Sequence, residues 1–67
     1  MNIYDSFLNA YEGDEIRVLA TTYLILSREE FRNTIELVVK DYEGNDTYSL
    51  FLSKSEMTVT HEDGYTL

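Results

Sequence analysis

Apolar residues recur at helical spacing at the start of the chain. Four of them fall on one side of a helix drawn over residues 2–11, namely Ile3, Phe7, Leu8 and Tyr11. Asn2 is a favoured residue for the cap that precedes a first helical turn. Gly13 follows the segment, and glycine is common just beyond the end of a helix. The pattern therefore predicts a short amphipathic helix over residues 2–11.

The spacing of apolar residues changes after Gly13 and becomes typical of strands. The segment 14–27, "DEIRVLATTYLILS", is rich in β-branched and aromatic residues, and predicts one long strand bent at Thr21–Thr22 or two short ones. The segment 47–53 predicts a strand with Tyr48, Leu50 and Leu52 on one face and Phe51 on the other. A further strand is expected over 57–61. The dipeptide Asp63–Gly64 then predicts a hairpin that returns the chain as residues 65–67.

Residues 28–42 allow two interpretations. Ser27 and Glu30 have the spacing of a capping box, so a helix that begins there could continue to residue 42. Read as a strand, the same region alternates Ile35, Leu37 and Val39 with polar neighbours such as Glu36. We favour one helical turn at 28–32 followed by a strand at 34–42, and keep the continuous helix as the alternative.

These elements describe an α+β fold in a single small domain of residues 1–67. A short N-terminal helix is followed by a small curled antiparallel sheet of four or five strands, with a second short helix near 28–32. A chain of 67 residues buries a thin core, and a sheet this small leaves an apolar face in need of cover. We expect the sheet to curl into a partial barrel or to pair with another copy, which makes a homo-oligomer the expected state.

Composition narrows the classes of function. The formal net charge is −8, from thirteen acidic and five basic residues. Such a charge disfavours direct binding to nucleic acid and to anionic membranes, and favours a basic protein partner. Because the chain has no cysteine and one histidine, we expect no disulfide, no metal and no cofactor. The chain begins without a basic leader and has no apolar run long enough to span a bilayer, so the sequence predicts a soluble, cytoplasmic protein.

The segment "DYEGND", residues 41–46, is the strongest candidate for metal chemistry. Counted from Asp41, however, the glycine is fourth rather than sixth and the twelfth position is Leu52, so the register of a calcium loop fails. The carboxylates are expected at an open turn, where nothing would raise the pKa of a catalytic acid. His61 has neither a nucleophile elbow nor a phosphate loop around it. The sequence therefore predicts that the protein is not an enzyme.

Acidic residues gather at the connections between predicted elements. Because alternate turns of an antiparallel sheet lie at the same end, two of these clusters could form one negative ridge with tyrosines beside it. Tyrosine beside carboxylate suits a protein interface, since arginine can stack on the ring. We take the following residues as candidate partner-binding residues: Glu12, Asp14, Glu15, Asp41, Tyr42, Glu43, Asp46, Tyr48, Glu62 and Asp63.

Two hypotheses about function follow. The first is a small acidic inhibitor that occupies a basic, nucleic-acid-binding surface of a partner protein, with carboxylates standing in for phosphates. In size, charge and lack of cysteine the chain resembles small phage-encoded anti-defence proteins that mimic nucleic acid, including some anti-CRISPR and anti-restriction proteins. No motif carries that resemblance, so it assigns no residue. The alternative is a self-associating structural or ligand-sequestering protein whose acidity serves solubility alone.

Overall fold

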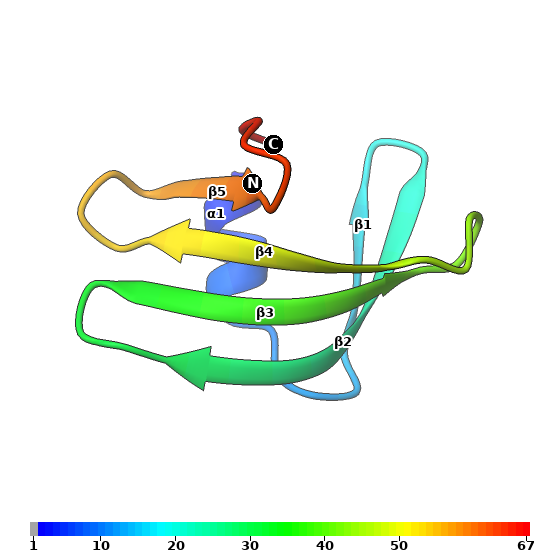
Figure 1. The fold of residues 1–67 in the computed structure, drawn as a ribbon, viewed down its shortest axis with the longest axis horizontal. Helices are drawn as coiled ribbons and strands as arrows, with labels where there is room; N and C mark the ends of the chain where they lie inside the picture. The colour runs from blue at the N-terminus through cyan, green and yellow to red at the C-terminus, as the bar shows by residue number, and fades with distance from the viewer. Residues whose placement is uncertain (1) are drawn as a thin grey trace.

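One helix and five strands make up the fold (Figure 1). A computed structural model describes residues 2–67. The elements are α1 (Ile3–Leu8), β1 (Glu15–Val18), β2 (Thr21–Glu30), β3 (Thr34–Asp41), β4 (Thr47–Ser53) and β5 (Thr58–His61). The strands pair antiparallel in chain order, β1-β2-β3-β4-β5. The predicted combination of a short N-terminal helix with a curled antiparallel sheet is confirmed, although the helix is small and the fold is mostly strand.

Helix α1 begins where the sequence predicted and ends earlier. The Asn2 side chain accepts a hydrogen bond from the Asp5 backbone N–H at 3.3 Å, which satisfies one of the unpaired donors of the first turn. Asn9 ends the helix, and its side-chain amide donates to the Asp5 carbonyl at 3.0 Å. Tyr11 therefore lies outside the helix and is exposed, whereas Phe7 is fully buried. The prediction of a helix that runs to residue 11 was too long.

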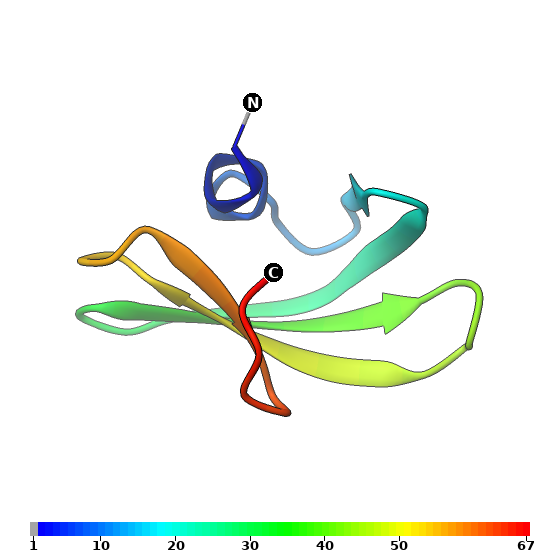
Figure 2. The ribbon, with the colours of Figure 1, turned by 90° about the horizontal axis from the view of Figure 1, so that it is seen from above.

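The sheet is curled, and α1 lies over its concave face (Figure 2). Alternation along each strand points one set of side chains to this face, as for Ile35, Leu37 and Val39 on β3. Helix α1 contacts β1, β4 and β5, so it closes the open side of a half-barrel. The buried core consists of Tyr4, Phe7, Ala10, Tyr23, Ile25, Ile35, Leu37, Val39, Leu50, Leu52 and Val59.

The apolar face that suggested self-association is thus covered within the chain itself. The alternating strands over 34–41 and 47–53 place most of their apolar residues under α1, whereas Val38 and Phe51 lie with the polar residues on the convex face. The apolar sheet face gives no reason for a second copy to bind, and the oligomeric state stays a prediction.

The helical turn predicted at 28–32 is wrong, and so is the alternative of a continuous helix. Residues 28–30 belong to β2 and pair with β3, so that Glu29 lies opposite Glu36. A single helical turn is marginal because its first hydrogen bond must fix several residues at once. The β2–β3 ladder supplies the backbone hydrogen bonds at lower entropic cost, and the predicted strand at 34–42 is confirmed as Thr34–Asp41.

Residues 14–27 form two strands rather than one, but the break lies before Thr21–Thr22. Val18 pairs with Thr21, so Leu19 and Ala20 make a two-residue hairpin loop. Leu19 adopts φ +57°, a conformation that usually selects glycine or asparagine, and 92% of its surface is exposed. No turn was predicted at Leu19–Ala20 because the loop contains no glycine, asparagine or aspartate.

The C-terminal residues cover the free edge of β5. The hairpin predicted at Asp63–Gly64 forms as a turn, in which the Gly64 N–H donates to the His61 carbonyl and Gly64 adopts φ +102°. The returning segment pairs with β5 through one bridge between Thr60 and Thr66. The Leu67 N–H also donates to the Val59 carbonyl at 2.8 Å. Unpaired strand edges promote association, so this segment protects one edge of the sheet.

A bulge in β2 decides how the sheet meets the helix. The pairing register between β2 and β3 shifts between Ile25 and Ser27, so Leu26 is an extra residue in the ladder. Without it, strand alternation would turn Arg28 toward the convex face. With it, Arg28 lies opposite Leu37 on the concave face, beneath the end of α1.

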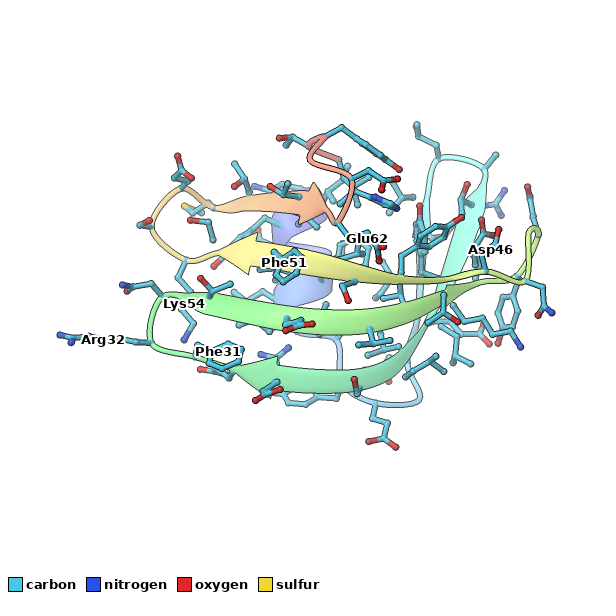
Figure 3. The ribbon with its side chains drawn as sticks, in the orientation of Figure 1. Phe31, Arg32, Asp46, Phe51, Lys54 and Glu62 are labelled. Carbon is cyan, nitrogen blue, oxygen red and sulfur yellow. The ribbon has the colours of Figure 1, made fainter. Side chains whose placement is uncertain are left out.

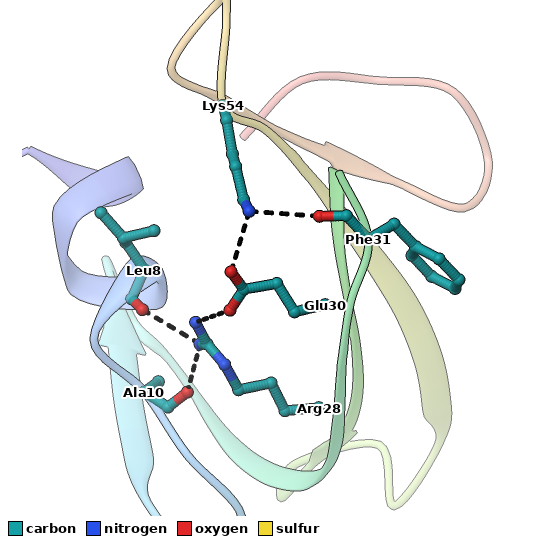
Figure 4. Close-up of polar contacts among 6 residues, drawn as sticks. All are labelled: Leu8, Ala10, Arg28, Glu30, Phe31 and Lys54. Carbon is teal, nitrogen blue, oxygen red and sulfur yellow. Dashed lines mark hydrogen bonds and ion pairs between the residues drawn. The ribbon is translucent and has the colours of Figure 1, made fainter. Parts of the chain in front are cut away.

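Arg28 joins the end of α1 to the sheet (Figure 4). Its guanidinium donates to the Leu8 carbonyl at 3.0 Å and to the Ala10 carbonyl at 2.8 Å, which helical hydrogen bonds do not satisfy. It also lies 3.4 Å from the Glu30 carboxylate and over the Tyr11 ring, 4.4 Å from the ring centre. Only 11% of the Arg28 side chain is exposed, so these contacts act in a partly dry environment.

Lys54 completes this network from the β4–β5 turn. Its ammonium group lies 2.8 Å from Glu30 and donates to the Phe31 carbonyl at 3.1 Å (Figure 4). The hydrogen bond and charge of Lys54, with a smaller effect of Arg28, hold the pKa of Glu30 below its ordinary value. Glu30 thus links the two cations that fasten α1, β2 and the β4–β5 turn.

We predict that Arg28→Met lowers the free energy of unfolding by about 2–3 kcal/mol, because it leaves two carbonyls and the Glu30 carboxylate without their charged donor. Arg32→Met is the matched control, since Arg32 is exposed in the β2–β3 turn and should change stability by no more than about 0.5 kcal/mol. Urea unfolding followed by circular dichroism measures both. Equal effects of the two variants would show that Arg28 does not anchor the helix.

Candidate partner-binding surfaces

The central candidate segment, residues 41–46, forms the β3–β4 turn. The Asp41 N–H donates to the Asp46 carbonyl at 2.8 Å and closes the turn. The Asp41 carboxylate accepts from the backbone N–H of Glu43 at 2.9 Å and of Gly44 at 3.4 Å. Asp41 therefore shapes the turn, as aspartate commonly does. Glu43 and Asp46 are exposed, so their charges face solvent.

A tyrosine connects this turn to the first acidic cluster. The Tyr42 hydroxyl donates to the Glu15 carboxylate at 2.8 Å, although the two residues are 27 positions apart in the sequence. This hydrogen bond, with the nearby negative charge, raises the pKa of Tyr42 above its ordinary value. Two of the predicted acidic clusters therefore do come together, through Glu15 and Tyr42.

The other two residues of the first cluster have different surroundings. The Asp14 carboxylate accepts from the Tyr11 N–H at 2.8 Å and orders the loop between α1 and β1. Glu12 is exposed in the same loop. Asp14 thus has a structural contact, and Glu12 contributes negative charge to the surface.

Aromatic rings link the β3–β4 turn to the C-terminal segment. His61 lies between two tyrosines, with ring centres 4.7 Å from Tyr48 and 4.5 Å from Tyr65. The Tyr48 hydroxyl also donates to Asp46 at 3.4 Å. Burial raises the pKa of Tyr48, and the charges of Asp46 and Asp41 raise it further. Burial also raises the pKa of Tyr23, with added effects of Tyr65 and Asp41.

His61 is part of this packed group and of the core. Only 3% of its surface is exposed. Its Nδ1 accepts a hydrogen bond from the Asp63 N–H at 3.0 Å. The Asp63 carboxylate lies 3.5 Å from the same nitrogen. Glu62, next in the chain, accepts from the Ser49 N–H with its side chain and continues the pairing of β4 beyond β5.

A second acidic surface, which was not predicted from the sequence, lies on the convex side of the sheet, and we call this side the outer face. One cross-strand row on it consists of Glu29, Glu36, Phe51 and Thr60, each directly opposite the next, and we call it the outer row. Figure 3 shows Phe51 on the side of the sheet away from α1. The alternation of Glu36 with Ile35 and Leu37 was the available signal. Glu29 was not recognised as the neighbour of Glu36, because residues 28–32 were predicted to form a helical turn.

The protein neutralises little of its negative charge internally. Across residues 2–67, Glu30 is the one acidic residue within 4.0 Å of a lysine or arginine nitrogen, which leaves the other twelve of thirteen without such a partner. Three of the five basic side chains are engaged inside the chain: Arg28 and Lys54 as above, and Arg17, which donates to the Leu19 carbonyl at 3.1 Å. The acidic surfaces therefore face solvent with their charge intact.

A small cavity lies between α1 and the β1–β2 hairpin. Its volume is about 360 Å³, and it is lined by Ile3, Ser6, Arg17, Val18 and Leu19. The Ser6 hydroxyl donates to the Asn2 carbonyl at 3.4 Å, and no histidine, aspartate or glutamate lines the cavity to act as a base for it. These five residues form no catalytic arrangement.

Metal-ligating side chains do not converge within residues 2–67, where no group of three or more His, Cys, Asp or Glu side chains is placed to hold an ion. In the same part of the chain, no helix has the length and apolarity needed to cross a membrane.

Comparison with known proteins identifies no relative. No protein family, no curated protein and no solved structure matches this chain. The assignment of function therefore depends on the surfaces described above.

We predict that Glu15→Gln lowers the pKa of Tyr42 toward its ordinary value of 10.0, because the amide keeps an acceptor oxygen and removes the charge. Because the raised pKa favours the protonated phenol in the folded state, its contribution to stability is complete below pH 10.0 and is lost as the pH rises through the folded value. Titration of tyrosinate absorbance, with Tyr42→Phe to assign the signal, measures the shift. An unchanged Tyr42 titration in Glu15→Gln would contradict the hydrogen bond.

Proposed function

We propose that this chain is a small non-enzymatic binding protein that inhibits a partner by occupying its basic, nucleic-acid-binding surface. The observation that carries the proposal is the lack of internal neutralisation, since twelve of the thirteen acidic residues within residues 2–67 have no lysine or arginine nitrogen within 4.0 Å. Concentrated like charge opposes folding of a small domain, and a basic partner would relieve that repulsion. The proposal places the chain among acidic anti-defence inhibitors, such as phage-encoded anti-CRISPR proteins.

The β3–β4 end of the molecule supports such a role. The carboxylates of Glu15 and Asp46 accept hydrogen bonds from the Tyr42 and Tyr48 hydroxyls, and the Asp41 carboxylate is fixed by backbone N–H groups of its own turn. Ordered side chains lose less conformational entropy when a partner binds. Carboxylates spaced on a rigid turn can contact arginine and lysine side chains that otherwise bind phosphates, and charge complementarity speeds the encounter.

Self-association is the alternative function. This hypothesis was based on an apolar sheet face that the sequence predicted to be uncovered, but α1 covers that face within each chain. A dimer formed through the outer face would bring Glu29 and Glu36 of both copies together, and like charges in contact are unfavourable. Sedimentation equilibrium at micromolar concentration separates the two cases. A mass above 7.8 kDa would support the alternative, whereas a mass of 7.8 kDa across the concentration range would contradict it.

Charge reversal at the turn tests the proposed function. We predict that a variant with Glu43→Lys and Asp46→Lys binds its partner at least tenfold more weakly, because each change removes an attraction and adds a repulsion. Asp41 is replaced by Asn in the same variant, since asparagine keeps the oxygen that accepts from Glu43 and Gly44. Glu56→Lys, a reversal at the exposed β4–β5 turn, is the matched control.

The partner is obtained by affinity capture from a lysate of the organism that carries the gene. The measurement is competition between this protein and nucleic acid for the captured partner, at increasing salt. Raising salt should weaken the complex as well, because the Debye length is only about 10 Å at 0.1 M. A partner that does not bind nucleic acid, or an affinity that is independent of salt, would contradict the proposal.

A further inference from the structure

The outer row is an uncovered surface in which an exposed ring lies beside one carboxylate, with a second carboxylate on the next strand. Glu29 of β2, Glu36 of β3 and Phe51 of β4 are consecutive partners across the sheet. Adjacent strands lie about 4.8 Å apart, so each side chain is within reach of the next. Phe51 is 37% exposed, and α1 covers only the opposite face (Figures 2 and 3).

The row contains an unfavourable pair. Glu29 and Glu36 lie directly opposite each other, and like charges in that position destabilise a sheet. Neither carboxylate has a lysine or arginine nitrogen within 4.0 Å in residues 2–67. Lys40, the other charged residue of β3 that alternates onto this face, lies four residues beyond Glu36, about 13 Å along the strand. Lys54 is held by Glu30 and the Phe31 carbonyl.

We propose that the outer row is the docking site for an arginine-rich segment of the partner protein, with an arginine guanidinium stacked on Phe51 and bound between Glu29 and Glu36. This proposal rests on the proposed function and names the face and the side chain that such a partner uses. The occupant follows from charge complementarity, since two unneutralised carboxylates in a row with an exposed ring favour a cation that also stacks.

Arginine meets these requirements better than lysine does. Its planar guanidinium stacks on aromatic rings and donates two parallel hydrogen bonds to a carboxylate, whereas an ammonium is a compact, strongly hydrated charge. The Ser49 hydroxyl lies 3.4 Å from the Glu36 carboxylate and donates to it, so that carboxylate already has one ordered contact. The guanidinium would use the remaining acceptor positions of Glu36 and those of Glu29.

A second copy of this chain does not fit the same site. Two outer faces in contact would place four carboxylates of Glu29 and Glu36 together, without a cation from either copy's row. Lys40 lies on this face toward the β3–β4 turn, Arg32 is exposed in the β2–β3 turn, and Lys54 is bound to Glu30. The charge of the row therefore selects a basic partner over self-association.

The test uses the full chain, labelled with ¹⁵N, and two synthetic peptides of equal length and charge. One peptide carries arginine and the other carries lysine at the same positions. Backbone amide shifts are followed as each peptide is added. We expect saturable shifts centred on Glu29, Glu36 and Phe51 with the arginine peptide, and at least threefold weaker binding of the lysine peptide. Shifts centred on residues 41–46, equal binding of the two peptides, or no binding would overturn the proposal.

Substitutions give a second readout in which stability and binding change in opposite directions. Glu36→Gln should raise the midpoint of urea unfolding, because it removes the repulsion from Glu29. The same substitution should weaken binding of the arginine peptide at least threefold. Phe51→Leu keeps an apolar side chain on the strand and should reduce the preference for arginine over lysine. Glu56→Gln makes the same change of charge at the exposed β4–β5 turn and is the control. If Glu56→Gln weakens binding of the arginine peptide as much as Glu36→Gln does, the effect comes from net charge alone, and the outer row is overturned as the site.

Failure of this proposal is distinguishable from failure of the proposed function. If the variant at residues 41–46 loses the captured partner while Glu36→Gln and Phe51→Leu keep it, the proposed function holds and the outer row is overturned as the site. If the captured partner binds independently of salt, the proposed function itself fails.

Discussion

The fold depends on how a six-residue helix is held over the concave face of a curled sheet. A helix of that length is not stable by itself, because one and a half turns cannot offset the cost of nucleation. Phe7 supplies apolar burial, and Arg28 supplies the hydrogen bonds that the end of the helix lacks. Arg28 reaches the helix only because the bulge at Leu26 turns it to the concave side.

As a result, the two faces of the sheet have different roles. The concave face and α1 form the buried core, to which β2, β3, β4 and β5 of the same chain contribute apolar residues. The convex face and the turns carry the carboxylates, which the few internal cations do not neutralise. Repulsion between like charges lowers the stability of a small domain. Because the acidic surface does not help the chain to fold, we take it as evidence about the binding partner.

The candidate site was predictable only in part. Clusters of acidic residues at turns are visible in the sequence, and the contact of Glu15 with Tyr42 brings two of them together. Their individual roles are not visible, because Asp41 and Asp14 use their carboxylates on nearby backbone N–H groups. The outer row was missed because cross-strand neighbours are set by register, and the bulge and the strand at 28–30 were needed to pair Glu29 with Glu36.

The sequence by itself determined the elements with strong local signals: the Asn2-capped helix, the alternating strand over 47–53, and the turn at Gly64. It favoured a strand over 34–41 without excluding a helix. The tertiary structure decided the ambiguous segments. Residues 28–30 became strand because pairing with β3 satisfies their backbone, and Leu19 accepts a positive φ because strands β1 and β2 require a tight loop there. Local preferences amount to fractions of a kcal/mol per residue, whereas a paired and packed sheet fixes many residues at once.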